Sequence, residues 1–150
     1  MPSAVNWEGV SPFTVVASAI FSALASSAMA SATGVIDNST GLDTYMWWEL
    51  KLDPTAAPEA TNPSVDLYMS QSLDGTNYPE DPVTGGTDCG HMYLGSFPTQ
   101  KIATNQRITI GPFAMPPHKF KIFADNQTGI PLSAGGSTTL SYATNNLEGQ

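Results

Sequence analysis

Residues 66–78 read Asp-Leu-Tyr-Met-Ser-Gln-Ser-Leu-Asp-Gly-Thr-Asn-Tyr. Apolar and polar side chains alternate over the first part of this stretch, and an Asp-Gly pair follows at 74–75. The alternation is typical of a half-buried strand, and Asp-Gly favours a tight reversal of the chain. Similar short runs follow, separated by Gly, Pro, Asn and Asp. The chain is therefore predicted to be built from strands.

The composition supports one all-β domain. The chain has 150 residues, of which 12% are charged, 13 are Gly and 12 are Pro. This balance suits many turns and short strands better than long surface helices. The single cysteine, Cys89, has no partner within the chain, so the fold must depend on packing and backbone hydrogen bonds. We expect one domain of the size that buries roughly two thirds of its unfolded surface.

The predicted strands downstream of the first forty residues are short and regularly spaced. They cover residues 44–53, 64–72, 91–97, 106–110, 118–124 and 138–142. Two further strands drawn from the Ala-rich segment before them bring the number to eight. Eight antiparallel strands in two packed sheets make a jelly roll, and this jelly-roll-like β-sandwich is the predicted fold.

The Ala-rich segment from Val15 to Ile36 is open to several interpretations. Its length would suffice for a membrane span, but it is rich in Ser and lacks flanking basic anchors. A secretory signal would need a positively charged start, yet Lys51 is the first base of the chain and Glu8 is acidic. Propensity alone favours a helix here, whereas the alternation of residues also fits strands. We expect no association with a membrane.

Charge is unevenly distributed along the chain, and the net charge is −8. Residues 1–100 contain a single base, Lys51, whereas residues 101–150 contain four bases and two acids. A phosphate backbone attracts clustered Lys and Arg side chains and is repelled by an acidic field. Nucleic acid is therefore excluded as an expected partner. The asymmetry could let the last third of one subunit meet the acidic part of another, or it could describe a solvated surface.

Several stretches together carry a resemblance to a known group of proteins. They are residues 36–40, 65–68, 74–78, 94–98, 106–110, 115–121 and 126–129. In this order, between about residues 13 and 143, the chain resembles small virion structural proteins of tailed bacteriophages. The resemblance implies a head decoration, or cement, protein of the jelly-roll type on the outer capsid. It also implies that the Ala-rich segment forms a strand, a turn and a second strand, which favours β structure there.

The sequence gives little support for a metal site. Cys89 and His91 lie beside Asp88, and His118 could approach them in space, but the spacing matches no metal motif. The same Cys and His lack the orienting group that a nucleophilic pair needs. An oxygen-rich loop could bind calcium through Asp74, Asn77, Glu80 and Asp81, although the Asp-Gly turn explains Asp74 equally well. We expect no catalytic residue, no metal and no cofactor.

Two glycosylation sequons begin at Asn38 and Asn126, and both are interpreted as turns because no targeting segment accompanies them.

Aromatic residues supply the candidate partner-binding positions. Trp47 and Trp48 are adjacent on a predicted strand, so their indoles point to opposite faces. If Tyr45 and Trp47 point inward, Trp48 is the exposed member and a candidate for binding; alternatively a loop or the N-terminal arm covers it.

The N-terminal arm, residues 1–13, is the other candidate contact. It is expected to place Val5, Trp7 and Val10 against a neighbouring subunit, or else to pack on its own domain. The sandwich is expected over residues 14–143, with a C-terminal tail at 144–150.

Together these features predict a non-enzymatic virion protein. We expect a capsid decoration protein on the outer surface of the virion, which binds the major capsid protein and further copies of itself as a homo-oligomer. A tail, neck or fibre accessory protein is the first alternative. A carbohydrate-binding β-sandwich that uses exposed aromatic side chains is the second.

Overall fold

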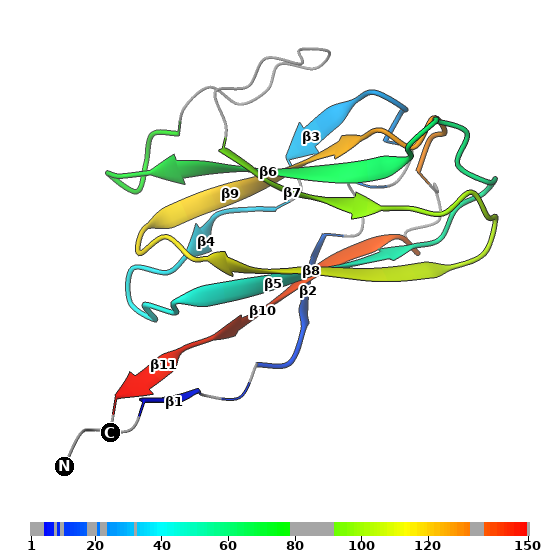
Figure 1. Cartoon of the computed structure of the whole chain (residues 1–150). Helices are drawn as coiled ribbons and strands as arrows, with labels where there is room; N and C mark the ends of the chain where they lie inside the picture. Colours follow the sequence, from blue (N-terminus) through cyan, green and yellow to red (C-terminus); the bar gives the residue numbers. More distant parts are fainter. Residues whose placement is uncertain are drawn as a thin grey trace.

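The computed structural model describes residues 5–7, 9, 11–17, 21, 24–31, 33–78, 92–132 and 137–149, and for 5–7, 17 and 147–149 it describes the backbone alone. All regular elements in this part of the chain are strands (Figure 1). Their bounds are β1 Val5–Trp7, β2 Thr14–Ala17, β3 Met29–Ser31, β4 Ile36–Asp37, β5 Tyr45–Leu52, β6 Ser64–Ser72, β7 Met92–Pro98, β8 Gln106–Ala114, β9 Lys119–Asn126, β10 Thr139–Asn145 and β11 Leu147–Gly149.

Two antiparallel sheets face each other and form a β-sandwich (Figure 1). One sheet has the strand order β2-β10-β5-β8, and the other has the order β3-β9-β6-β7, with the short β4 also paired to β9. The pairing is nested, because β2 pairs with β10, β3 with β9, β5 with β8 and β6 with β7. A chain whose first strand pairs with its last, and so on inward, is a jelly roll. The predicted fold class is confirmed.

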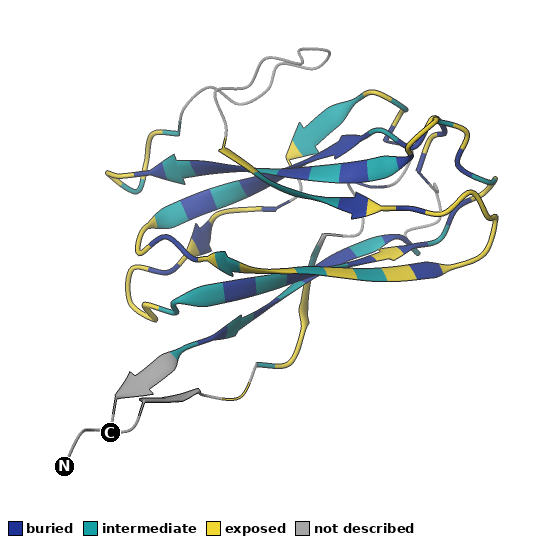
Figure 2. Ribbon diagram, viewed as in Figure 1, coloured by how far each residue is buried: buried dark blue, intermediate teal, exposed yellow. Residues whose placement is uncertain are grey.

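Alternation along the strands places the hydrophobic core between the sheets. On β5 the side chains of Met46, Trp48, Leu50 and Leu52 are buried, while the intervening residues are partly or fully exposed. Strand β6 shows nearly the same alternation (Figure 2). Strand β9 alternates only at its start, and its residues 122–126 are all buried. The strand period of two residues thus fixes which face of each sheet is apolar.

The expected orientation of the two tryptophans is wrong. Trp48 is fully buried, with its ring centroid 5.4 Å from that of Tyr142, whereas Trp47 is only partly buried. The reason lies in the rest of the strand, because the face of Trp47 also carries Glu49 and Lys51, whose charges must stay in water. Trp48 is therefore a core residue and cannot present its ring to a partner.

The Ala-rich segment contains no α-helix in its described residues, of which Phe21 alone has a 3-10 conformation. It forms β2 and β3, which belong to different sheets, and residues 24–28 connect toward β3. Phe21 and Leu24 are buried in the core between them. Pairing of β2 with β10 and of β3 with β9 outweighs the helical propensity of Ala. The strand, turn and strand implied by the resemblance are thus present, and the helix favoured by propensity is not.

A turn at Gly129, which follows β9, packs against the loop that precedes β6. Gly129 has a φ of +85°, and a Cβ at this position would lie 2.5 Å from the backbone nitrogen of Ala60. The backbone N–H groups of Glu59 and Ala60 both donate to the carbonyl oxygen of Thr128, at 3.0 and 3.1 Å. Only glycine combines this left-handed conformation with such a close approach of two backbones.

The two ends of the chain pair with each other. β1 lies antiparallel to β11, with Val5 opposite Gly149 and Trp7 opposite Leu147. Next to this ribbon, the Ser11 backbone N–H donates to the carbonyl oxygen of Thr144 at 2.9 Å. The ribbon continues beyond the end of β10 and extends away from the sandwich (Figure 1). The expected C-terminal tail is therefore partly strand, since β10 runs to Asn145 and β11 follows it.

Candidate interaction surfaces

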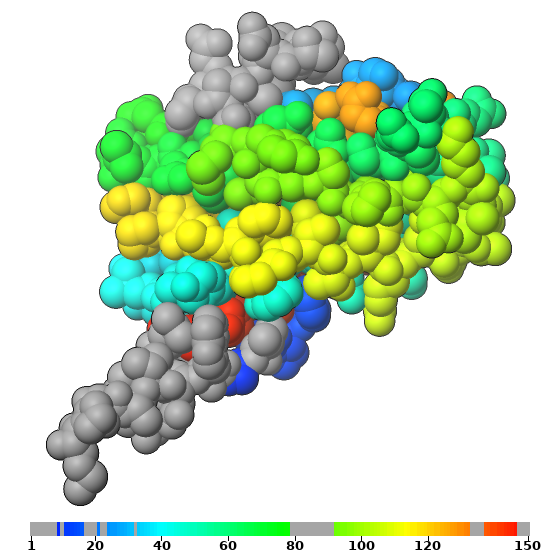
Figure 3. Space-filling view, in the orientation of Figure 1, coloured from blue at the N-terminus to red at the C-terminus, as the bar shows by residue number. Residues whose placement is uncertain are grey.

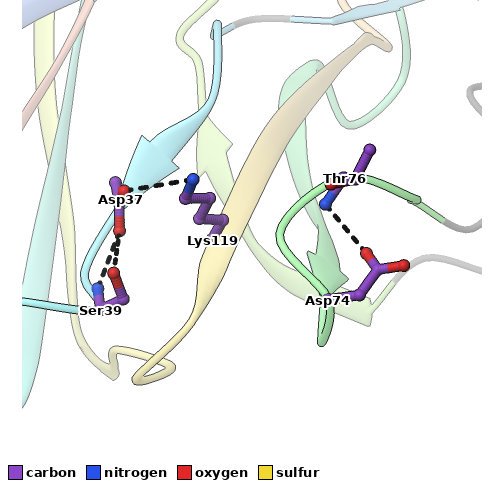
Figure 4. Close-up of polar contacts among 5 residues, drawn as sticks. All are labelled: Asp37, Ser39, Asp74, Thr76 and Lys119. Atoms are coloured by element: carbon purple, nitrogen blue, oxygen red, sulfur yellow. Dashed lines mark hydrogen bonds and ion pairs between the residues drawn. The ribbon is translucent and has the colours of Figure 1, made fainter.

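The turn after β6 is held by a single carboxylate. Asp74 Oδ1 accepts a hydrogen bond from the backbone N–H of Thr76 at 2.9 Å (Figure 4). It also accepts bonds from Ser72 Oγ (2.9 Å) and the backbone N–H of Asn77 (2.8 Å), and Asp74 Oδ2 accepts one from Asn77 Nδ2 (2.6 Å). These donors, the backbone of Asn77 first, hold the pKa of Asp74 far below its usual range. The turn itself thus uses this carboxylate, as expected of an Asp-Gly reversal.

A second turn, which follows β4 and contains Ser39, lies close to the first, and Lys119 lies between the two turns. Its Nζ is 3.5 Å from Asp37 Oδ2 (Figure 4). Its aliphatic stem passes Gly75 so closely that a Cβ added to this glycine would lie 3.3 Å from Lys119 Cδ. Asp37 also accepts hydrogen bonds from Ser39 Oγ and N, and these bonds are the main cause of its lowered pKa. A groove of about 220 Å³ separates the turns, with Leu73 beside it, 83% exposed.

Polar side chains gather on the outer face of the β3-β9-β6-β7 sheet. Asp66 on β6 lies opposite Asp125 on β9 and Ser96 on β7. Asp125 is only 8% exposed, and its carboxylate accepts a hydrogen bond from Gln127 Nε2 at 2.8 Å. Burial is the main cause that raises the pKa of Asp125. The hydrogen bond from Gln127 lowers this pKa, and the neighbouring Asp66 carboxylate, the smallest of the three causes, raises it. Two like charges therefore face each other across neighbouring strands.

This pair predicts a stabilising substitution. Asp125→Asn should raise the free energy of unfolding at pH 7 by up to about 1 kcal/mol, because it removes a like charge directly opposite Asp66 while keeping an oxygen for Gln127. A raised pKa in the folded state means that the folded protein holds its proton more tightly than the unfolded chain, so Asp125 costs stability as pH rises through and above its usual value of 3.8. Urea denaturation at pH 7 and pH 3 should show the gain at pH 7 only.

Asp74→Asn is the control, because it should lower the free energy of unfolding at pH 7 where Asp125→Asn should raise it. The pKa of Asp74 is lowered, so its carboxylate contributes stability above the usual value of 3.8 and loses it as pH falls through the folded-state pKa. The control should therefore be less stable than wild type at pH 7. A loss of stability at pH 7 in Asp125→Asn would show that its carboxylate is needed in the charged form.

The predicted partner-binding residues are described only in part. Val5 and Trp7 lie on β1, which pairs within its own chain, and their side chains are outside the described residues, as is all of Val10. Trp48 is in the core. In the described part of the arm, β1 pairs with β11 of the same chain. The expected contact of the arm with a neighbouring subunit stays a prediction.

The candidate metal positions are only partly described. Cys89, His91, Asp88, Glu80 and Asp81 lie outside the described residues. His118 is exposed in the loop before β9. Within the described ranges, no three His, Cys, Asp or Glu side chains group as metal ligands, and no helix there is long and apolar enough to span a bilayer.

The two sequon asparagines are both buried and engaged. Asn38 Nδ2 donates to the carbonyl oxygens of Asp43 and Pro116, each at 2.9 Å, and Asn38 Oδ1 accepts the backbone N–H of Asp43 at 2.8 Å. Asn126, at the end of β9, is fully buried. Both amides thus hold turns in place, as interpreted from the sequence.

Comparisons of the chain with models of protein families, with curated proteins and with solved structures found no match. The surfaces described above are therefore interpreted from their own geometry.

Proposed function

We propose that this protein is a non-enzymatic structural protein of a virion, which attaches to the outside of an assembled capsid and stabilises it. Its partners would be the major capsid protein and other copies of the chain. The jelly-roll fold and the sequence resemblance to small virion proteins of tailed bacteriophages support this proposal. A tail, neck or fibre accessory protein is the alternative with the same fold.

The observation that carries the proposal is the ribbon of β1 and β11. The two strands pair only three residues on each side and extend away from the sandwich (Figure 1). A two-stranded ribbon is marginally stable by itself in water, and its outer edges expose backbone groups that can pair with another chain. Docking on a neighbouring protein would satisfy those groups by strand addition. Both chain ends would then serve as one attachment element.

The acidic charge favours the outer surface of the capsid. The chain has a net charge of −8, and only five Lys and Arg residues. On the inner surface it would face packaged nucleic acid, whose phosphates would repel it. On the outer surface this cost is absent.

Removal of the protein from virions provides the test. Particles without it should assemble but break at a lower temperature, because a ligand that binds only the assembled shell stabilises that shell in proportion to its affinity and occupancy. Adding back the full chain should restore the breaking temperature, measured by light scattering and release of DNA. A variant lacking residues 1–12 should keep its folded sandwich, checked by circular dichroism, but restore the temperature less. Finding the protein only in the tail, or inside the head, would contradict the proposal.

A further inference from the structure

The outer face of β6 and β7 carries an aromatic pair beside a polar network. Strand alternation and register place Tyr68 opposite Tyr93, and Asp66 opposite Ser96, across the β6–β7 ladder. The two tyrosine rings contact edge to face, with centroids 5.5 Å apart and an interplanar angle of 62°. Tyr93 is 54% exposed, so one face of this pair is open to solvent. An exposed ring on an otherwise polar sheet face is a candidate binding surface.

Hydrogen bonds hold the Tyr93 ring in place. Ser96 Oγ donates to Asp66 Oδ1 at 2.5 Å, and Tyr93 Oη lies 2.7 Å from Ser96 Oγ. Because Ser96 has a single hydroxyl proton and gives it to the carboxylate, Tyr93 must be the donor in the second bond. The ring is thus fixed by its hydroxyl at one end and by Tyr68 on its side. A ring that is already ordered loses little entropy when a ligand packs on it.

A groove begins where this network ends. Ser64 Oγ also donates to Asp66 Oδ1, at 2.9 Å, and both Ser64 and Ser96 line an open groove of about 490 Å³. Its other lining residues include Thr61, Asn62 and Pro98. The loop before β6 and the end of β7, which form its sides, are neighbours at the right of Figure 3.

The sides of the groove are tied together. The backbone N–H and the hydroxyl of Thr99 both donate to the carbonyl oxygen of Pro63, at 2.9 and 3.1 Å. The groove is therefore formed before any ligand arrives, as is usual for small-molecule sites.

We propose that this groove, together with the exposed ring of Tyr93, binds a neutral oligosaccharide. A sugar ring has a C–H face that can pack on an aromatic ring, and a rim of hydroxyl groups that both donate and accept hydrogen bonds. Among the described residues, the hydrogen bonds from Ser64 and Ser96 to Asp66 both end on Oδ1, so Oδ2 is placed to accept a sugar hydroxyl in a strong charge-assisted bond. Thr61, Asn62 and the lone pairs of Ser64 extend the polar contacts along the groove.

Charge distinguishes this ligand class from others. Lys101 is the one cation among the residues that line the described groove, whereas phosphate recognition uses several Arg or Lys side chains. Asp66 and the adjacent Asp125 would repel an acidic sugar. The groove is open, and hydroxyl and amide groups line it beside Pro63 and Pro98, so it offers no enclosed apolar cavity to a lipid chain. An uncharged chain of sugars fits all three observations.

An array of neutral and acidic oligosaccharides, probed with the purified full-length protein, tests the proposal without any capsid. We expect retention on neutral oligosaccharides, and calorimetry with the best of them should show at least tenfold weaker binding for Tyr93→Ala, as for loss of an aromatic anchor. Asp66→Asn should weaken binding as well. Met92→Ala is the matched control, because Met92 is exposed on the same strand but is the neighbour of Tyr93 and so points to the other face.

Three results would overturn the proposal. One is that the wild-type protein retains none of the oligosaccharides on the array. Another is that Tyr93→Ala, shown to be folded by circular dichroism, binds the oligosaccharide as well as wild type and the Met92→Ala control do. The third is a preference for acidic sugars that Lys101→Ala abolishes. None of these results depends on where the protein is found in a virion, so this site and the proposed capsid role fail separately.

Discussion

Replacement of Trp48 by alanine should lower the free energy of unfolding by about 3–5 kcal/mol, the range for removal of a large aromatic side chain from a core. Trp48 is fully buried between the sheets, and its ring lies against that of Tyr142 with the centroids 5.4 Å apart. The loss combines the apolar area returned to water with a cavity that the surrounding strands cannot close. Urea denaturation followed by circular dichroism would measure it.

Trp47→Ala is the matched control for this substitution. Trp47 is the preceding residue of β5, has the same side chain and is only partly buried, so its loss should cost less than half as much. If Trp48→Ala does not fold, Trp48→Phe keeps a ring against Tyr142. It also removes an indole N–H that has no hydrogen-bond partner among the described residues, so its cost should be smaller. Equal losses in Trp47→Ala and Trp48→Ala would contradict the observed orientation of β5.

The strands could be predicted from the sequence because alternation and turn residues are local signals. The predicted strand 64–72 coincides with β6, and the Asp-Gly turn follows it as expected. β8 is longer than predicted, since it continues from Ile110 to Ala114 through Gly111 and Pro112, two residues that usually end a strand. The pairing with β5 is irregular at these two residues and resumes at Phe113 and Ala114, which lie opposite Met46 and Tyr45.

The predicted orientation of β5, with Trp47 inward and Trp48 outward, is wrong, although the sequence contains the signal that decides it. Aromatic residues occur on both faces, at Tyr45 and Trp47 on one and at Trp48 on the other. The charged residues Glu49 and Lys51 occur on one face alone, and they mark it as the outer one. A buried charge costs more than an exposed ring, so charge is the better guide to the direction of a strand.

The residues of the proposed sugar site could not be assembled from the sequence. Asp66 and Tyr68 alternate on one strand, and Tyr93 and Ser96 belong to the next, but only the β6–β7 register makes them neighbours. A bulge between Leu67 and Tyr68 shifts that register. Because a shift of one residue would send side chains to the other face, no pattern within either strand could predict the cluster.

Asn126 illustrates the same limit in the core, where a residue interpreted as part of a turn joins distant segments. Its Nδ2 donates to the carbonyl oxygens of Leu24 (3.0 Å), Ala25 (3.2 Å) and Ile130 (2.8 Å). Its Oδ1 accepts the backbone N–H (3.1 Å) and the hydroxyl (2.7 Å) of Thr128. One fully buried amide thus links the segment before β3 to the loop after β9.

Asn126→Asp should therefore destabilise the protein by about 3–5 kcal/mol at pH 7, although the side chain keeps its size. The substitution replaces an amide donor with a carboxylate that faces three carbonyl oxygens, and each buried group left without its partner costs about 1–3 kcal/mol. Protonation of the new carboxyl group returns one O–H donor, so part of the loss should disappear as pH falls. Urea denaturation at pH 7 and at pH 4 would measure both effects. Asn105→Asp, the same change at an exposed loop position, is the control and should alter stability by no more than about 0.5 kcal/mol. If Asn126→Asp and Asn105→Asp are equally mild, the buried amide does not hold these segments together, and the Ala-rich segment must be fixed by the pairing of β2 and β3 alone.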